Sequence, residues 1–115
     1  MDPLLGMKSI RAEDWVALPG FAGLEQVVLS GSLDEPNRKG QRTRLVRFAP
    51  GMKTTTTLVH EYHEEACLVE GSLQVVGKPE TKITAPAFVH RPPGTDHGPF
   101  ESVDGCVMAE IHYFV

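Results

Sequence analysis

Turn-forming residues divide this chain into short segments, and that division restricts the possible folds more than any other feature. Glycine occurs 11 times and proline 9 times in 115 residues, often in pairs such as Pro50-Gly51. The stretches between them are rich in β-branched and aromatic residues, and only a short turn near 12–16 has any helical character. The predicted strands are 27–29, 42–48, 54–60, 66–69, 73–76, 88–91 and 106–115. Short strands with frequent turns predict an all-β, antiparallel sandwich or barrel.

The length predicts one domain, because a chain of this size buries one modest hydrophobic core. We assign residues 1–10 to a disordered or loosely attached leader and residues 11–115 to the single domain. The polar stretch 30–40 is predicted to be a flexible loop, because turn-forming and charged residues fill it.

Charge and terminal sequence restrict the partners and the compartment. The chain has 15 acidic against 11 basic residues, a balance that argues against a nucleic-acid partner. No apolar run approaches the ~20 residues of a membrane span, and an acid at Asp2 argues against a signal peptide. Cys67 and Cys106 form no CxxC pair and are predicted to be buried core residues. We therefore predict a cytoplasmic protein with no membrane partner.

All five histidines lie between His60 and His112, and potential metal ligands are densest in the segment 54–71. These ligands are His60, Glu61, His63, Glu64, Glu65 and Glu70. Imidazole nitrogen and carboxylate oxygen together suit Zn, Fe, Mn, Ni or Cu. The zincin pattern HExxH is absent, because His60-Glu61-Tyr62-His63 is one residue too short. We expect His60 to end one strand and Glu64 to open the next, so that both face a shared interior.

His97 follows a turn, 91–97, that contains two prolines and a glycine. The prolines restrict φ and the glycine permits a left-handed residue, so the turn can direct His97 back into the barrel. Two histidines and one carboxylate form a facial set that leaves coordination positions open, which is typical of non-haem Fe(II) oxygenases. His60, Glu64 and His97 are therefore the candidate metal ligands.

These residues resemble the two sequence motifs of the cupins. Glu64 and Gly71 have the separation of the first motif, and His60 stands where its second histidine belongs. Pro92, Gly94 and His97 match the second motif. The stretches 45–51 and 92–97 also resemble the cupin domain of ChrR-like anti-sigma factors, and the likeness extends from about Trp15 to the end. The resemblance implies a double-stranded β-helix, the RmlC-like jelly-roll barrel.

The chain departs from the cupin pattern at three positions. Leu58 stands where the first histidine belongs, Pro86 replaces a glycine and Glu101 replaces the final asparagine. The site is thus one ligand short of the usual three histidines and one glutamate. Three alternatives follow: His63 substitutes for the missing ligand, the site works with three ligands, or metal binding has been lost.

Other side chains are candidates for a substrate pocket. Arg47 can anchor a carboxylate through its guanidinium fork, although a cross-strand ion pair is an equal alternative. Tyr62 and His90 are the other pocket candidates. In the last strand, Val107, Ala109, Ile111, Tyr113 and Val115 form an apolar set that we expect to face the core. Glu110 and His112 would then lie on the wetter face, with His112 in contact with solvent or an interface.

Three classes of function are open to a chain with this resemblance, and we expect its partner to be a small molecule. The first is a metal-dependent enzyme, with non-haem dioxygenase ahead of isomerase or lyase, using Fe, Zn, Mn or Ni. The second is a stand-alone metal- or ligand-binding sensor, and the third is a cupin that binds a small molecule without metal. Apolar strand surface near 67–69 and Phe114 predicts a homodimer.

Overall fold

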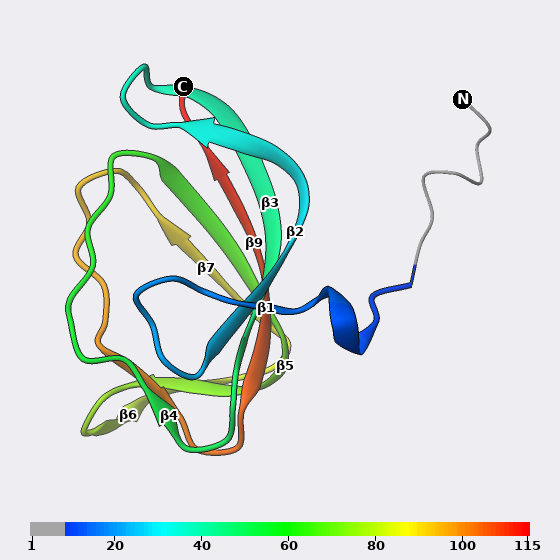
Figure 1. Ribbon diagram of the computed structural model, residues 1–115. Helices are drawn as coiled ribbons and strands as arrows, with labels where there is room; N and C mark the ends of the chain where they lie inside the picture. The colour runs from blue at the N-terminus through cyan, green and yellow to red at the C-terminus, as the bar shows by residue number, and fades with distance from the viewer. Residues whose placement is uncertain (1–8) are drawn as a thin grey trace.

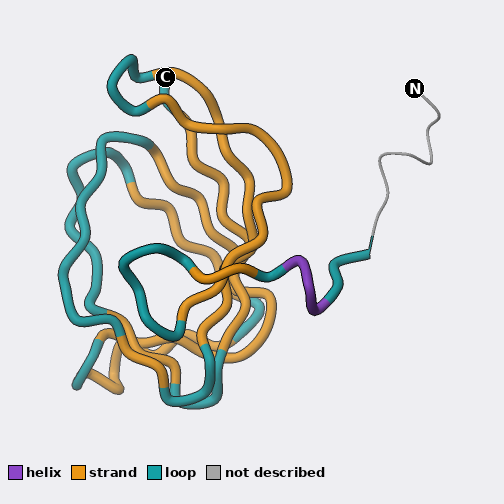
Figure 2. Tube along the Cα trace, viewed as in Figure 1, coloured by secondary structure: helices purple, strands orange, loops and turns teal. Residues whose placement is uncertain are grey.

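The computed structural model describes residues 9–115, so nearly all of the predicted leader 1–10 lies outside the described residues. The regular secondary structure of the described part is almost entirely strand, joined by loops as Figure 2 shows, with one short 3-10 helix, η2 (Ala12–Asp14). The strands are β1 (Val16–Ala17), β2 (Leu24–Asp34), β3 (Lys39–Phe48), β4 (Met52–Lys53), β5 (His63–Val75), β6 (Lys78–Thr84), β7 (Ala87–Arg91), β8 (Phe100–Ser102) and β9 (Cys106–Tyr113). Within residues 9–115, no helix has the length and apolarity that crossing a bilayer requires.

The strands form one curled antiparallel sheet in the order β1-β2-β3-β9-β5-β8-β4, with β6 and β7 also paired to β5 (Figure 1). The first half of β5 lies between β9 and β7, and its second half pairs with β6 and β8. The all-β expectation is confirmed. The sheet β2-β3-β9-β5-β7 forms one wall of the molecule, called here the main wall.

β5 is one long bent strand, whereas the sequence predicts two strands, 66–69 and 73–76. A register shift between Leu68 and Glu70 bends it, and Gly71 follows with φ +78°. A side chain at Gly71 would place its Cβ 2.0 Å from the carbonyl oxygen of Gly105. The glycine therefore marks a close contact with the neighbouring strand rather than a chain reversal.

Two other predictions of local structure are wrong. The stretch 30–40 is not a flexible loop, because β2 and β3 stay paired as far as Asp34 and Lys39, and only the tip between them is a turn. The predicted strand 54–60 is a loop between β4 and β5. Its only β-bridge in the described structure joins Leu58 to His97, which lies in the facing loop.

The two faces of β9 are reversed relative to the prediction. Met108, Glu110 and His112 point into the barrel, and His112 is completely buried. Ile111, from the apolar set, is 42% exposed on the outside. The two sets of side chains therefore alternate as predicted, but the polar set faces inward where the apolar set was expected. The reason is that arginines and carboxylates inside the barrel bind the polar set.

The apolar core lies within the same barrel. Its buried members are Leu24, Val46, Phe48, Leu68, Leu73, Cys106 and Met108. Cys106 is buried as predicted, whereas Cys67 is exposed because it lies on the outer face of β5. The barrel interior thus combines an apolar core with a cluster of charged and polar groups.

Candidate metal centre

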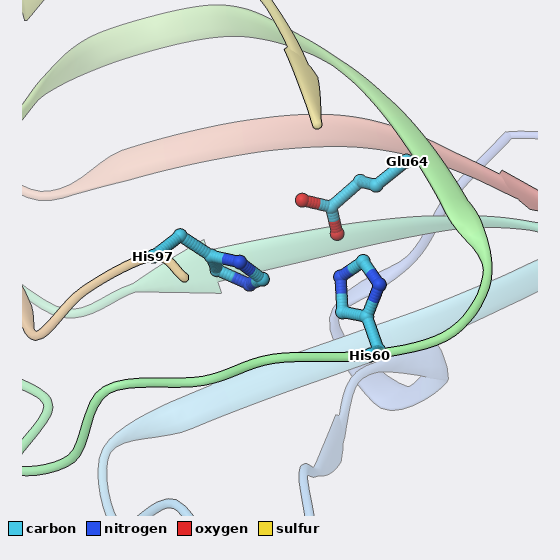
Figure 3. Close-up of side chains that lie close together, drawn as sticks. All are labelled: His60, Glu64 and His97. Atoms are coloured by element: carbon cyan, nitrogen blue, oxygen red, sulfur yellow. The ribbon is translucent and has the colours of Figure 1, made fainter. Parts of the chain in front are cut away.

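Three separate segments bring His60, Glu64 and His97 together (Figure 3). His60 comes from the loop between β4 and β5, Glu64 from the start of β5, and His97 from the loop between β7 and β8. One nitrogen or oxygen of each side chain lies within 4.8 Å of those of the other two. The two loops lie side by side in Figure 1, and the backbones of Leu58 and His97 join them through hydrogen bonds of 2.7 and 2.8 Å.

Hydrogen bonds to backbone carbonyls orient both histidines. His60 Nδ1 donates to the carbonyl of Tyr62 at 2.9 Å, and His97 Nδ1 donates to that of Thr95 at 3.3 Å. In its neutral form, each ring therefore offers Nε2 as the acceptor. His60 Nε2 is buried and has no hydrogen-bond partner in the described structure. A buried acceptor facing a carboxylate and a second imidazole fits a divalent metal ion.

Glu64 is held ionised by two donors. His112 Nε2 donates to its Oε1 at 2.8 Å, and Arg91 Nη1 donates to its Oε2 at 2.7 Å. Burial alone would raise the pKa of Glu64, but these hydrogen bonds and the charge of Arg91 lower that pKa to about 2. Such outer partners orient a ligating carboxylate, and each carboxylate oxygen retains a further lone pair.

His112 links two carboxylates to an arginine. Arg42 donates to His112 Nδ1 through Nη2 at 2.7 Å and Nε at 3.1 Å, so the ring proton belongs on Nε2. Burial alone would lower the pKa of His112, whereas hydrogen bonds with Glu110 and Glu64 raise it. Glu64, Glu110 and His112 are also close enough to hold an ion. Both ring nitrogens of His112 already have protein partners, however. The group Glu64, Glu110 and His112 therefore supports the cluster of His60, Glu64 and His97.

A cavity of about 100 Å³ opens onto these groups. Its polar lining consists of Arg44, Thr54, His60, Tyr62, Glu64, Arg91, His97 and Glu110. Much of its remaining wall consists of Leu18, Phe21, Leu24, Phe48, Leu73 and Phe100. The Tyr62 ring stacks on His60 with centroids 3.9 Å apart, and burial raises the pKa of the Tyr62 phenol. Tyr62, one of the candidate pocket residues, thus lines this cavity.

His63 is not brought to this cluster. It precedes Glu64 on β5 and therefore faces the opposite side of the sheet, where its ring stacks on Tyr113 with centroids 5.0 Å apart. Leu58 lines the cavity at the position of the missing ligand. The arrangement therefore does not match the alternative in which His63 replaces that ligand.

Arg47 and His90 are on the outer surface, so neither is a pocket residue. Arg47 donates to Glu25 at 2.9 Å and lies over the ring of Trp15 at 4.2 Å. This is the cross-strand ion pair that the sequence analysis left open. His90 is exposed on β7 beside His63. Both predictions are wrong because odd-numbered β3 residues from Thr43 and even-numbered β7 residues point outward.

Sequence reasoning missed four residues that line or support the site: Arg44, Arg91, Glu110 and His112. In register, Arg42 lies opposite His112, His112 opposite Glu64, and Glu64 opposite Arg91. This row of four side chains, called here the inner row, crosses β3, β9, β5 and β7. Strand parity places Arg44 on the face of Val46 and Phe48, which is the signal that could have indicated it.

Comparison with solved structures identifies the architecture. An acetylacetone dioxygenase from Acinetobacter johnsonii matches with a TM-score of 0.72 and 18% identity, over 95% of this chain and 76% of that chain. An RmlC-like cupin from Shewanella frigidimarina gives 0.66 and 17%, over 92% and 89%. This chain has the cupin fold. The predicted jelly-roll β-barrel is thereby confirmed.

A further match concerns the predicted likeness to the cupin domain of ChrR-like anti-sigma factors. A chain in the complex of Rhodobacter sphaeroides SigE with the anti-sigma ChrR matches with a TM-score of 0.61 and 17% identity, over 88% of this chain and 50% of that chain. No protein-family model matches the sequence, and no curated protein matches it. Identities at this level establish the fold of this chain and leave its activity to the site itself.

Proposed function

We propose that this cupin is a small-molecule enzyme of the non-haem dioxygenase type, with a divalent metal ion held by His60, Glu64 and His97. The observation that carries the proposal is the buried, unpartnered Nε2 of His60, which faces the other two groups. Acetylacetone dioxygenases among the similar structures support the reaction type. This set of three ligands does not include His63. Of the three alternatives that the sequence left open, the proposal therefore adopts the site that works with three ligands.

When bound, the metal supplies a Lewis acid with open positions for substrate oxygens and O2. A facial set of two histidines and one carboxylate favours Fe over Zn, Mn or Ni. His112 and Arg91 hold Glu64 in place, and Tyr62 holds His60. Leu58 and Phe100 line the cavity with apolar surface and limit the access of water.

Two other classes of function remain alternatives to the enzyme. A stand-alone metal- or ligand-binding sensor draws support from the likeness to the anti-sigma ChrR complex. Capture of a sigma factor by the purified protein would favour that function. A cupin that binds a small molecule without metal draws support from Leu58 at the position of the missing ligand.

We also propose that the protein is a cytoplasmic homodimer. The outer face of the main wall carries a row formed by Leu45, Ala109, Cys67 and Phe88, which pair across β3, β9, β5 and β7. Phe88 is 60% exposed, and Val69 beside this row is 50% exposed. We call Leu45, Ala109, Cys67 and Phe88 the outer row. Contiguous apolar surface of this kind favours a second copy, because self-association removes it from water.

Oxygen uptake tests the enzymatic proposal. The protein is loaded with Fe(II) under anaerobic conditions and then mixed with air-saturated buffer and a panel of β-diketones and keto acids. We expect substrate-dependent uptake, with His97→Ala reducing the rate by roughly 100-fold or more. His90→Ala is the matched control, because His90 lies on the outer surface. Bound iron without uptake for any substrate would contradict the dioxygenase assignment.

A further inference from the structure

The cavity is lined by two partly buried arginines as well as two buried carboxylates. The side chains of Arg44 and Arg91 are 13% and 11% exposed, and those of Glu64 and Glu110 are each 7% exposed. Arg44 Nε donates to Glu110 at 2.8 Å, and Arg91 Nη1 donates to Glu64 at 2.7 Å. These four charges balance one another before any metal or ligand binds.

A divalent ion would disturb that balance. His60 and His97 each direct Nδ1 at a backbone carbonyl, so both would bind the ion through Nε2 as neutral ligands. The metal would therefore add two positive charges to a partly buried site in which Glu64 and Glu110 already pair with arginines. Uncompensated charge in such a site is costly, so a ligand that carries negative charge is favoured over a neutral one of the same shape.

Arg91 also has donors available for such a ligand. A guanidinium carries five N–H groups in a planar fork, and in the described structure Arg91 uses Nη1 alone, to bind Glu64. Its guanidinium carbon lies over the Phe100 ring, 5.1 Å from the centroid, and Phe100 also lines the cavity. Arg44 also lines the cavity, and its Nε and Nη1 contact Glu110 and Gln26.

We propose that the ligand of this site is a small keto acid, with its carboxylate on Arg91 and Arg44 and its keto oxygen toward the metal ligands. This inference rests on the proposed metal site and specifies its substrate class. The apolar part of the wall, which includes Phe21, Leu24 and Leu73, suits a short hydrocarbon body. A neutral β-diketone would leave the arginine donors without a partner, a loss that selects strongly against such a ligand.

Acetoacetate and acetylacetone provide a matched pair of probes, because a carboxylate in one replaces an acetyl group in the other. Binding of each is measured by isothermal titration to the Zn(II)-loaded and the metal-free protein, so that no turnover is needed. We expect the Zn(II)-loaded protein to bind acetoacetate at least tenfold more tightly than it binds acetylacetone. Arg91→Gln should abolish this preference, and Arg91→Lys should retain part of it, because lysine keeps the charge but not the fork.

Arg47→Gln is the matched control, because Arg47 also pairs with a glutamate and covers an aromatic ring, but on the outside. It should leave the preference unchanged. If Arg91→Gln does not fold, as judged by circular dichroism, Arg44→Gln and Arg91→Lys provide the same comparison. Equal affinity for both probes would overturn the keto acid proposal. So would a preference that survives Arg91→Gln or, if that variant does not fold, one that Arg44→Gln and Arg91→Lys leave undiminished.

The metal-free titration separates the two proposals. A preference for acetoacetate that depends on Arg91 in protein unable to hold Zn(II) would support the anion site and overturn the metal site. Zn(II) binding at one ion per chain with no preference between the probes would support the metal site and overturn the anion site. Loss of both Zn(II) binding and the preference for acetoacetate would overturn both proposals.

Discussion

The inner and outer faces of the main wall carry opposite chemistry on the same four strands. The inner row, Arg42, His112, Glu64 and Arg91, is charged or polar and faces the barrel interior. The outer row is mostly apolar and faces outward. A soluble barrel usually has the reverse distribution. The difference fits the two proposals made for this wall: an ion and a ligand bound inside, and a second copy of the chain bound outside.

The inner face is stable because its polar groups satisfy one another. Arg42 binds His112, His112 binds Glu64, and Glu64 binds Arg91. Among buried side-chain nitrogens and oxygens of the described residues, His60 Nε2 and His63 Nδ1 have no partner. Of these two, only His60 faces other potential metal ligands. His60 Nε2 beside this network is thus the acceptor that the proposed ion site requires.

Neighbouring residues of β9 give the largest expected contrast. His112→Ala removes a completely buried ring and leaves Glu64 and Arg42 each without one partner. We expect the free energy of unfolding to fall by roughly 3–5 kcal/mol. Ile111→Ala, on the outer face, should lower it by about 1 kcal/mol or less. Urea denaturation followed by circular dichroism measures both. Equal losses would contradict the inverted faces.

A charge in the outer row should change assembly rather than folding. Phe88→Asp places a carboxylate in the apolar row, so we expect the dimer to dissociate while the circular dichroism spectrum stays unchanged. Val103→Asp is the matched control, because Val103 is also 60% exposed but lies in the loop before β9. Light scattering after size exclusion gives the masses. A wild-type monomer at micromolar concentration would refute the dimer.

The two cysteines sharpen the comparison at single side chains. Cys106 is buried, and burial raises the pKa of its thiol, so less reactive thiolate exists at any given pH. Cys67 is exposed in the outer row. In the monomeric Phe88→Asp protein, iodoacetamide should label Cys67 quickly and Cys106 only after denaturation, as measured by mass spectrometry. Similar native rates for both thiols would contradict their opposite placement.

The sequence was informative where the chemistry depends on local spacing. Strand alternation in β9 and the motif residues His60, Glu64 and His97 are local patterns, and the structure brings those three residues together. The direction of the alternation could not be predicted, because apolar residues normally face the core, whereas here a charged network occupies the interior. The inner row depends on the register of four strands that are distant in sequence, which no local pattern specifies.

Metal content tests the central claim most directly. The protein is incubated with Fe(II), Zn(II), Mn(II) or Ni(II), freed of excess metal, and analysed by elemental mass spectrometry. We expect one ion per chain in the wild type, a loss of that ion in His60→Ala and His97→Ala, and its retention in His63→Ala and His90→Ala. Less than about 0.1 ion per chain in the wild type with every metal would contradict the proposed centre.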